Sequence, residues 1–150
     1  MADTIRFMIS PKLVNTILDN NFGSPTEEYL KTDIYVGLGI EFDEENFEFT
    51  KEPVSKGFTI LPDPILFETP TYGYIRNIEG IEWPRAKQAW STSTDPIRYI
   101  GLYYKTSEES AQEPEYELMV VLPLIPEEVV NISERVVLNP NSIQIKLSNR

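Results

Sequence analysis

The spacing of apolar residues along the chain changes near residue 33. Before that point apolar side chains recur at helical spacing and form one stripe, which consists of Leu13, Val14, Ile17 and Leu18. Ser10 is a suitable N-cap, Pro11 fits the first helical position, and Gly23 can adopt the left-handed conformation that ends a helix. The pattern therefore predicts one short helix over about residues 11–22.

After residue 33 the apolar runs are short and rich in β-branched and aromatic residues, as is typical of strands. We expect strands at 34–40, 97–104, 116–124 and 142–147. The last alternates polar with apolar residues, so its inward side chains should be Ile143, Ile145 and Leu147. In the first strand, Gly37 and Gly39 share one face and leave it bare for another chain segment or a large ring.

The segments between these strands are less regular. The acidic stretch 41–48 is interpreted as a solvated loop anchored by Phe42 and Phe47, because it lacks the alternation and glycine of a calcium-binding EF-hand loop. The polar run 105–114 predicts an exposed loop between two strands of a hairpin. Further short strands are expected at 129–132 and 136–138.

Many short strands, 12 prolines and one helix favour a mainly β fold. We expect an antiparallel β-sandwich of jelly-roll type with one short N-terminal helix, forming a single domain over residues 1–150. The side chains expected in its core are Trp83, Ile100, Leu102, Leu118, Val120, Ile143 and Ile145.

Composition excludes several classes of chemistry. The 150 residues include no Cys and no His, which removes disulfides, thiol nucleophiles, the usual zinc ligands and His-based catalysis. Thirteen basic against 24 acidic residues give a formal charge of −11, which argues against binding nucleic-acid phosphates. No apolar run reaches the length of a membrane helix, and no secretory signal is visible. We therefore expect no cofactor, metal, nucleic acid or membrane, and synthesis in the cytoplasm.

Two candidate sites remain. Carboxylates could act in pairs at Glu79 and Glu82 or at 43–45, and Glu82 beside Trp83 could be a desolvated acid. Alternating glutamates are more typical of the wet face of a strand. Trp83 and Trp90, together with tyrosines, could form a sugar-stacking platform, although large aromatic side chains more often belong to a core or an interface.

The order of residues between 80 and 104 is more specific than composition. A strand ends in an aromatic residue, proline, any residue and alanine; a tryptophan follows, and then a strand with an isoleucine and a hydrophobic–Gly–hydrophobic core. The positions that carry the pattern are Trp83, Pro84, Ala86, Trp90, Ile97, Ile100, Gly101 and Leu102. This pattern resembles one found in small tail-associated and other virion structural proteins of bacteriophages.

The resemblance implies a non-enzymatic virion structural protein of the tail, baseplate, fibre attachment, neck or capsid decoration. Such a protein would contact other virion proteins and form homo-oligomers. Its candidate interface residues are Leu13, Val14, Ile17, Leu18, Phe42 and Phe47. Two alternatives remain: a carbohydrate-binding module for host glycans, and an acidic phage-encoded inhibitor that mimics nucleic acid. The acids gather in 41–52 and 107–117 instead of spreading evenly, which favours the structural role over the mimic.

Overall fold

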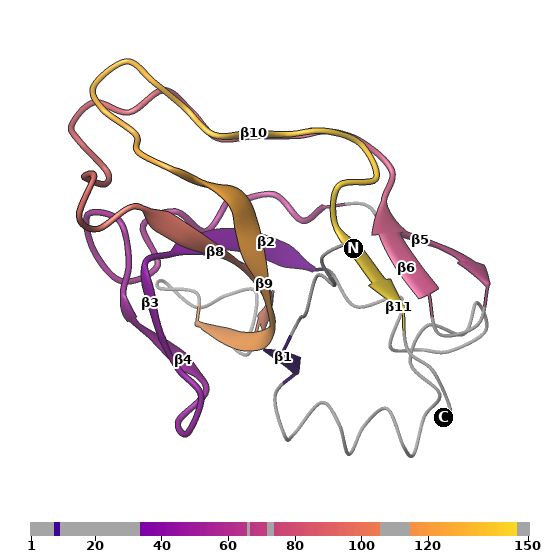
Figure 1. Ribbon diagram of the computed structural model, residues 1–150. Helices are drawn as coiled ribbons and strands as arrows, with labels where there is room; N and C mark the ends of the chain where they lie inside the picture. The colour runs from indigo at the N-terminus through magenta and orange to yellow at the C-terminus, as the bar shows by residue number, and fades with distance from the viewer. Residues whose placement is uncertain (1–7, 10–33, 66, 72–73, 106–114, 147–150) are drawn as a thin grey trace, which may run out of the picture.

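A computed structural model describes residues 8–9, 34–65, 67–71, 74–105 and 115–146 of the chain (Figure 1). Within these ranges the regular structure is entirely antiparallel β-strand, so the predicted mainly β class is confirmed. The helix expected over 11–22 lies outside the described residues, as does the stripe Leu13, Val14, Ile17 and Leu18. The described part of the chain contains no helix that could span a membrane.

Within the described ranges, the strands form one four-stranded sheet, one three-stranded sheet and two two-stranded pairs. In spatial order the sheets are β1-β9-β8-β2, β11-β6-β5, β3-β4 and β10-β7. The strand bounds are β1 Met8–Ile9, β2 Tyr35–Gly39, β3 Glu41–Asp43, β4 Glu48–Lys51, β5 Phe67–Thr71, β6 Tyr74–Asn77, β7 Ile81–Glu82, β8 Ile97–Lys105, β9 Tyr116–Glu128, β10 Val137–Leu138 and β11 Gln144–Lys146. Strands therefore occur in all four segments where the principal strands were expected.

The four-stranded sheet has two different faces. In the β2–β8 register, Val36 lies opposite Leu102, and the neighbouring pair is Gly37 opposite Gly101. Because successive side chains in a strand point to opposite faces, the first pair belongs to an aliphatic face and the second to a nearly bare one. A bulge between Leu102 and Tyr103 shifts the pairing of β8 with β9, and Leu118 becomes the partner of Tyr103.

The aliphatic face borders the larger core cluster. Val36, Leu38 and Leu102 from the sheet join Trp83 and Val136, all of them buried. Of the seven side chains expected in the core, six are buried: Trp83, Ile100, Leu102, Leu118, Val120 and Ile143. The seventh, Ile145, lies in β11, but its side chain is outside the described part.

Two long segments, 81–91 and 130–138, run side by side between the four-stranded and the three-stranded sheets (Figure 1). Their pairing continues beyond β7 and β10 through backbone hydrogen bonds from Trp83 N to Val136 O (3.1 Å) and from Trp90 N to Val130 O (2.8 Å). The strand expected over 129–132 is wrong: β9 continues to Glu128, and Val130 N then binds the Ser91 hydroxyl at 2.9 Å. The Ser91 side chain thus binds a backbone N–H that would donate to a backbone carbonyl if the strand continued.

A buried asparagine joins the three-stranded sheet to the turn before β11. The Asn77 side-chain amide donates to Glu79 O (2.7 Å) and Asn139 O (3.2 Å), and its oxygen accepts from Ile143 N (2.8 Å). Its own N–H bonds Ile143 O at 3.3 Å. Each polar atom of a fully buried side chain is therefore paired, as stability requires.

Candidate functional site

Seven of the eight residues that carry the 80–104 pattern lie in the core or in the sheet, and Pro84 is the exception. Ala86, Trp90, Ile97, Ile100 and the two already named, Trp83 and Leu102, are buried in the larger core. Gly101 lies in the sheet beneath aromatic side chains. Pro84 is exposed and lines a groove that is described below.

The two tryptophans are buried and cannot form an open sugar-stacking platform. Trp83 is 1% exposed and Trp90 is 5% exposed. The Trp83 indole N–H donates to Thr59 O at 2.7 Å, and the Thr59 hydroxyl accepts from Leu38 N at 2.9 Å. The indole therefore connects the 59–65 segment to the core. Packing and this buried hydrogen bond occupy the side chains considered as a sugar-stacking platform, in agreement with the expectation that large aromatic side chains more often belong to a core.

The candidate carboxylates do not converge. Glu79 and Glu82 are both exposed, and Glu82 pairs with Arg135 at 3.7 Å, so it is not the desolvated acid considered from sequence. Asp43 uses its carboxylate inside a turn, accepting from Glu45 N (3.0 Å) and from the Asn46 side chain (2.7 Å). No group of three or more potential metal ligands gathers among the residues that the structure describes.

The bare face of β2 and β8 accommodates a large ring, as Gly37 and Gly39 predicted. A Cβ added to Gly39 would lie 2.4 Å from the Phe49 ring, and one added to Gly101 would lie 2.8 Å from the same ring. A Cβ at Gly37 would meet Tyr103 and Ile60 at 3.0 Å. The Phe49 ring therefore occupies space on both strands that is free only because Gly39 and Gly101 have no Cβ.

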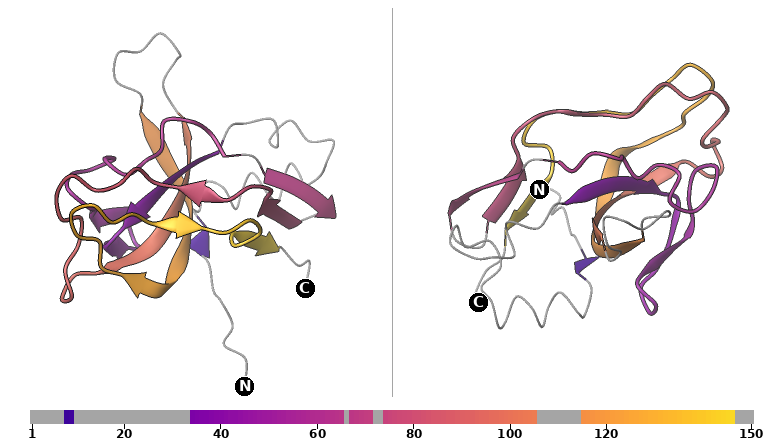
Figure 2. Two further views of the ribbon diagram at one scale, coloured as in Figure 1. Left: turned by 90° about the horizontal axis from the view of Figure 1, so that it is seen from above. Right: turned by 180° about the vertical axis from the view of Figure 1, so that it is seen from behind.

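Phe49 arrives on a hairpin that was expected to be a loop. Residues 41–51 form β3 and β4, joined by a turn, and the hairpin projects from the body (Figures 1 and 2). Phe42 is half-buried and packs edge-on against Phe47 (ring centroids 5.1 Å apart) and Phe49 (5.9 Å). The loop interpretation of 41–48 is wrong for 41–43 and 48, which are strands, because these rings give the acidic stretch an apolar side on which strands can pair. It holds for the exposed turn at 44–47, and Phe42 and Phe47 are half-buried.

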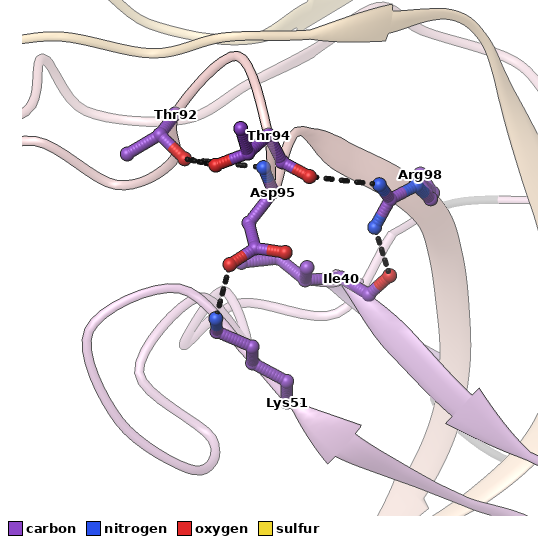
Figure 3. Close-up of polar contacts among 6 residues, drawn as sticks. All are labelled: Ile40, Lys51, Thr92, Thr94, Asp95 and Arg98. Carbon is purple, nitrogen blue, oxygen red and sulfur yellow. Dashed lines mark hydrogen bonds and ion pairs between the residues drawn. The ribbon is translucent and has the colours of Figure 1, made fainter.

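A polar network fixes the base of this hairpin to the loop before β8 (Figure 3). Lys51 Nζ binds Asp95 Oδ2 at 2.5 Å, and this contact raises the pKa of Lys51 and lowers that of Asp95. Arg98 donates to Thr94 O (3.2 Å) and to Ile40 O (3.3 Å), the latter at the junction of β2 and β3. The network therefore connects the base of the hairpin to the loop before β8, and Arg98 of β8 to the end of β2.

One pocket, of about 570 Å³, opens beside the bare face of β2 and β8. Its lining combines carboxylates, tyrosines and one lysine, namely Glu52, Lys56, Gly57, Ile60, Tyr103, Glu115, Tyr116 and Glu117. Burial raises the pKa of Glu52, although the Gly57 N–H that it accepts at 3.0 Å acts the other way. Burial raises the pKa of Tyr103, and the charge of Glu52 raises it further. Burial also raises the pKa of Tyr104, with a smaller contribution from its hydrogen bond to Glu117, to about 12. The raised pKa values keep the hydroxyls of Tyr103 and Tyr104 protonated near neutral pH, so neither is an activated nucleophile.

A second hollow, of about 440 Å³, is mainly apolar, and we call it the apolar groove. It is lined by Phe58, Thr59, Ile60, Leu61, Pro62, Trp83, Pro84, Arg85, Lys87, Gln88 and Trp90. Phe58 is 49% exposed and meets Trp90 edge-on, with ring centroids 6.0 Å apart. Sequence reasoning missed this groove because the 53–62 and 83–90 segments meet only in the fold; the WPRA stretch was the available signal.

Comparison with known proteins gives no assignment. No family model, no curated protein and no solved structure matches the chain.

Proposed function

We propose that the protein is a non-enzymatic bacteriophage virion structural protein that acts through protein–protein contacts. Its place would be in the tail, baseplate, fibre attachment, neck or capsid decoration, with other virion proteins and further copies of itself as partners. It would be made in the host cytoplasm and end in the particle, without a cofactor and without contact to nucleic acid or membrane.

The observation that carries this proposal is the contrast between the buried apolar residues of the 80–104 pattern and the exposed apolar residues elsewhere in the described part. Its apolar residues build the core, whereas large apolar side chains elsewhere stay on the surface. The exposed ones are Val54, Phe58, Ile78, Ile125, Val129, Ile132 and Val137. Ile125 is 69% exposed and Ile132 64%, and both come from the end of β9 and the segment after it. Phe58 in addition lines the apolar groove, and an exposed apolar patch of this kind suits contacts with other proteins.

At the level of the fold, we propose that the sheets amount to a jelly-roll-like sandwich completed by the short N-terminal helix over 11–22. The antiparallel pairing throughout and the two covered faces of the four-stranded sheet support this arrangement. The stripe on that helix, with Phe42 and Phe47, remains the proposed interface set.

The two alternatives have less support. A glycan-binding role would need another platform, since Trp83 and Trp90 are buried. A nucleic-acid mimic would need acids spread over its surface. The exposed cations Arg85 and Lys87, beside an apolar groove, interrupt such a surface.

Immunogold labelling of purified phage particles tests the proposal. Antibodies raised against the full chain should place gold at one discrete structure of the particle in negative stain, and preimmune serum should not. Absence of the chain from particles would contradict the proposal. So would a reproducible hydrolase activity that Glu82→Gln or Glu79→Gln abolishes.

A further inference from the structure

We propose that the tip of the β3–β4 hairpin of one copy docks into the apolar groove of a second copy. The inference rests on the proposed function, since it specifies how copies of a virion protein would associate. Two features that have no ion-pair partner within the described residues, an apolar groove with cations and a projecting acidic turn, complement each other.

Within the described ranges, the groove places two exposed cations beside apolar surface. Arg85 and Lys87 are exposed in its lining, and none of its lining residues carries a carboxylate. Arg85 donates to Ser133 O at 2.8 Å, but within the described ranges neither cation has a carboxylate within ion-pair distance.

Three other cations of the described part are ion-paired, and Lys56 lines the first pocket together with three carboxylates. Lys51 pairs with Asp95, Arg98 with Glu127 at 3.2 Å, and Arg135 with Glu82. In a chain with 24 acidic and 13 basic residues, two cations without a carboxylate beside an apolar hollow indicate that the groove receives an acidic segment.

The hairpin tip has the matching chemistry. Glu44 and Glu45 are exposed at the turn, and no described cation forms an ion pair with either. The Asp43 carboxylate binds Glu45 N and the Asn46 side chain, so the turn is held in one shape before docking. Preorganisation of this kind lowers the entropic cost of association. Phe47, half-buried beside the acids, adds apolar surface that suits Phe58 in the groove.

The docking must be between copies. The hairpin base is fixed by the Lys51–Asp95 ion pair and by the hydrogen bond from Ile40 N to Lys51 O at 2.9 Å. From that base the hairpin extends away from the body in the views of Figures 1 and 2. A tip-to-groove contact uses two different patches, so it is heterologous and generates rings or filaments.

Charge reversal in full-length protein tests the contact, with sedimentation velocity as the readout. The wild type should self-associate, and more weakly at high salt. Arg85→Glu with Lys87→Glu, and separately Glu44→Lys with Glu45→Lys, should each weaken association by about tenfold or more, because each creates like-charge contacts. Glu79→Lys, which reverses an acid outside both elements, is the control and should associate like the wild type.

Mixing the two reversed proteins should restore association, because each tip then meets a groove of opposite charge. Circular dichroism of each variant should match the wild type, since every changed side chain is exposed. Wild-type behaviour of both reversed variants, or no rescue on mixing, would overturn the docking mode. A monomeric wild type that is nevertheless labelled in particles would overturn it too, and the proposed function would stand.

Discussion

The two faces of the four-stranded sheet solve the same packing problem in opposite ways. On the aliphatic face the strands themselves supply the bulk, through residues such as Val36, Leu38 and Leu102. On the other face β2 and β8 place glycines between their tyrosines, and the Phe49 ring from the β3–β4 hairpin fills the space next to Gly39 and Gly101. The cluster there is Tyr35, Phe49, Tyr103, Leu118 and Val121, with Met8, Phe42, Phe47, Ile60, Tyr99 and Tyr116 at its margin.

This difference shows where each face is vulnerable. The aliphatic face loses most when a large side chain is removed, since a cavity remains in a close-packed interior. We call the face that carries Gly37, Gly39 and Gly101 the glycine face. On this face, stability falls most when a methyl group is added, because the Phe49 ring lies close to Gly39 and Gly101. It also depends on the hairpin that carries Phe49, so its integrity is tied to the segment that we propose as the docking element.

Truncation of Trp83 should have the largest effect. Trp83→Ala should lower the free energy of unfolding by about 3–5 kcal/mol, as in other aromatic truncations in cores. The substitution also leaves the carbonyl of Thr59 without the indole N–H. Urea titration followed by circular dichroism measures the change, with Trp83→Phe as the control that keeps a ring but loses the N–H. A loss below about 1 kcal/mol would contradict the buried position.

Addition of one methyl group to the glycine face should rank second. Gly39→Ala should cost about 1–3 kcal/mol, because the new Cβ overlaps the buried Phe49 ring and forces it to shift. The same titration applies. In a Phe49→Ala background the cost of Gly39→Ala should largely vanish, since the double-mutant cycle removes the clash. Equal costs in both backgrounds would show that Phe49 does not occupy this space.

The smallest expected effect is a pH dependence at the margin of the glycine face. Burial raises the pKa of Glu52 in the folded chain, so its ionised form is disfavoured there relative to the unfolded chain. Its contribution to stability is therefore most favourable below the unfolded pKa and declines as the pH rises through the folded one. Glu52→Gln, which keeps an oxygen for Gly57 N, should be more stable than the wild type near neutrality.

At acidic pH that difference should disappear, because the wild-type carboxyl is then protonated in both states. Thermal melts at several pH values follow the difference, with Glu79→Gln as an exposed control of the same chemistry. A Glu52→Gln advantage that grows as the pH falls would have the wrong sign and would contradict the burial of Glu52.

Much of the β framework was predictable because strand patterns are local. The β-branched and aromatic runs located β2, β8, β9 and β11, since alternation requires only neighbouring residues. The hairpin at 41–51 was not predictable in the same way. Its acids dominate the local composition, and the rings of Phe42 and Phe49 stabilise strands only once they meet each other and the sheet. Phe49 itself gave no signal beyond its hydrophobicity.

By itself, the sequence determined that a bare face exists, since Gly37 and Gly39 lie two residues apart in an extended run. It also determined that cysteine and histidine chemistry is excluded. Only the tertiary structure decided that Phe49 fills the bare face, that Trp83 and Trp90 are buried, and that Arg85 and Lys87 border an apolar groove. The physical reason is that a side chain's periodicity is a property of its own strand, whereas its partner is chosen by contacts between segments distant in sequence.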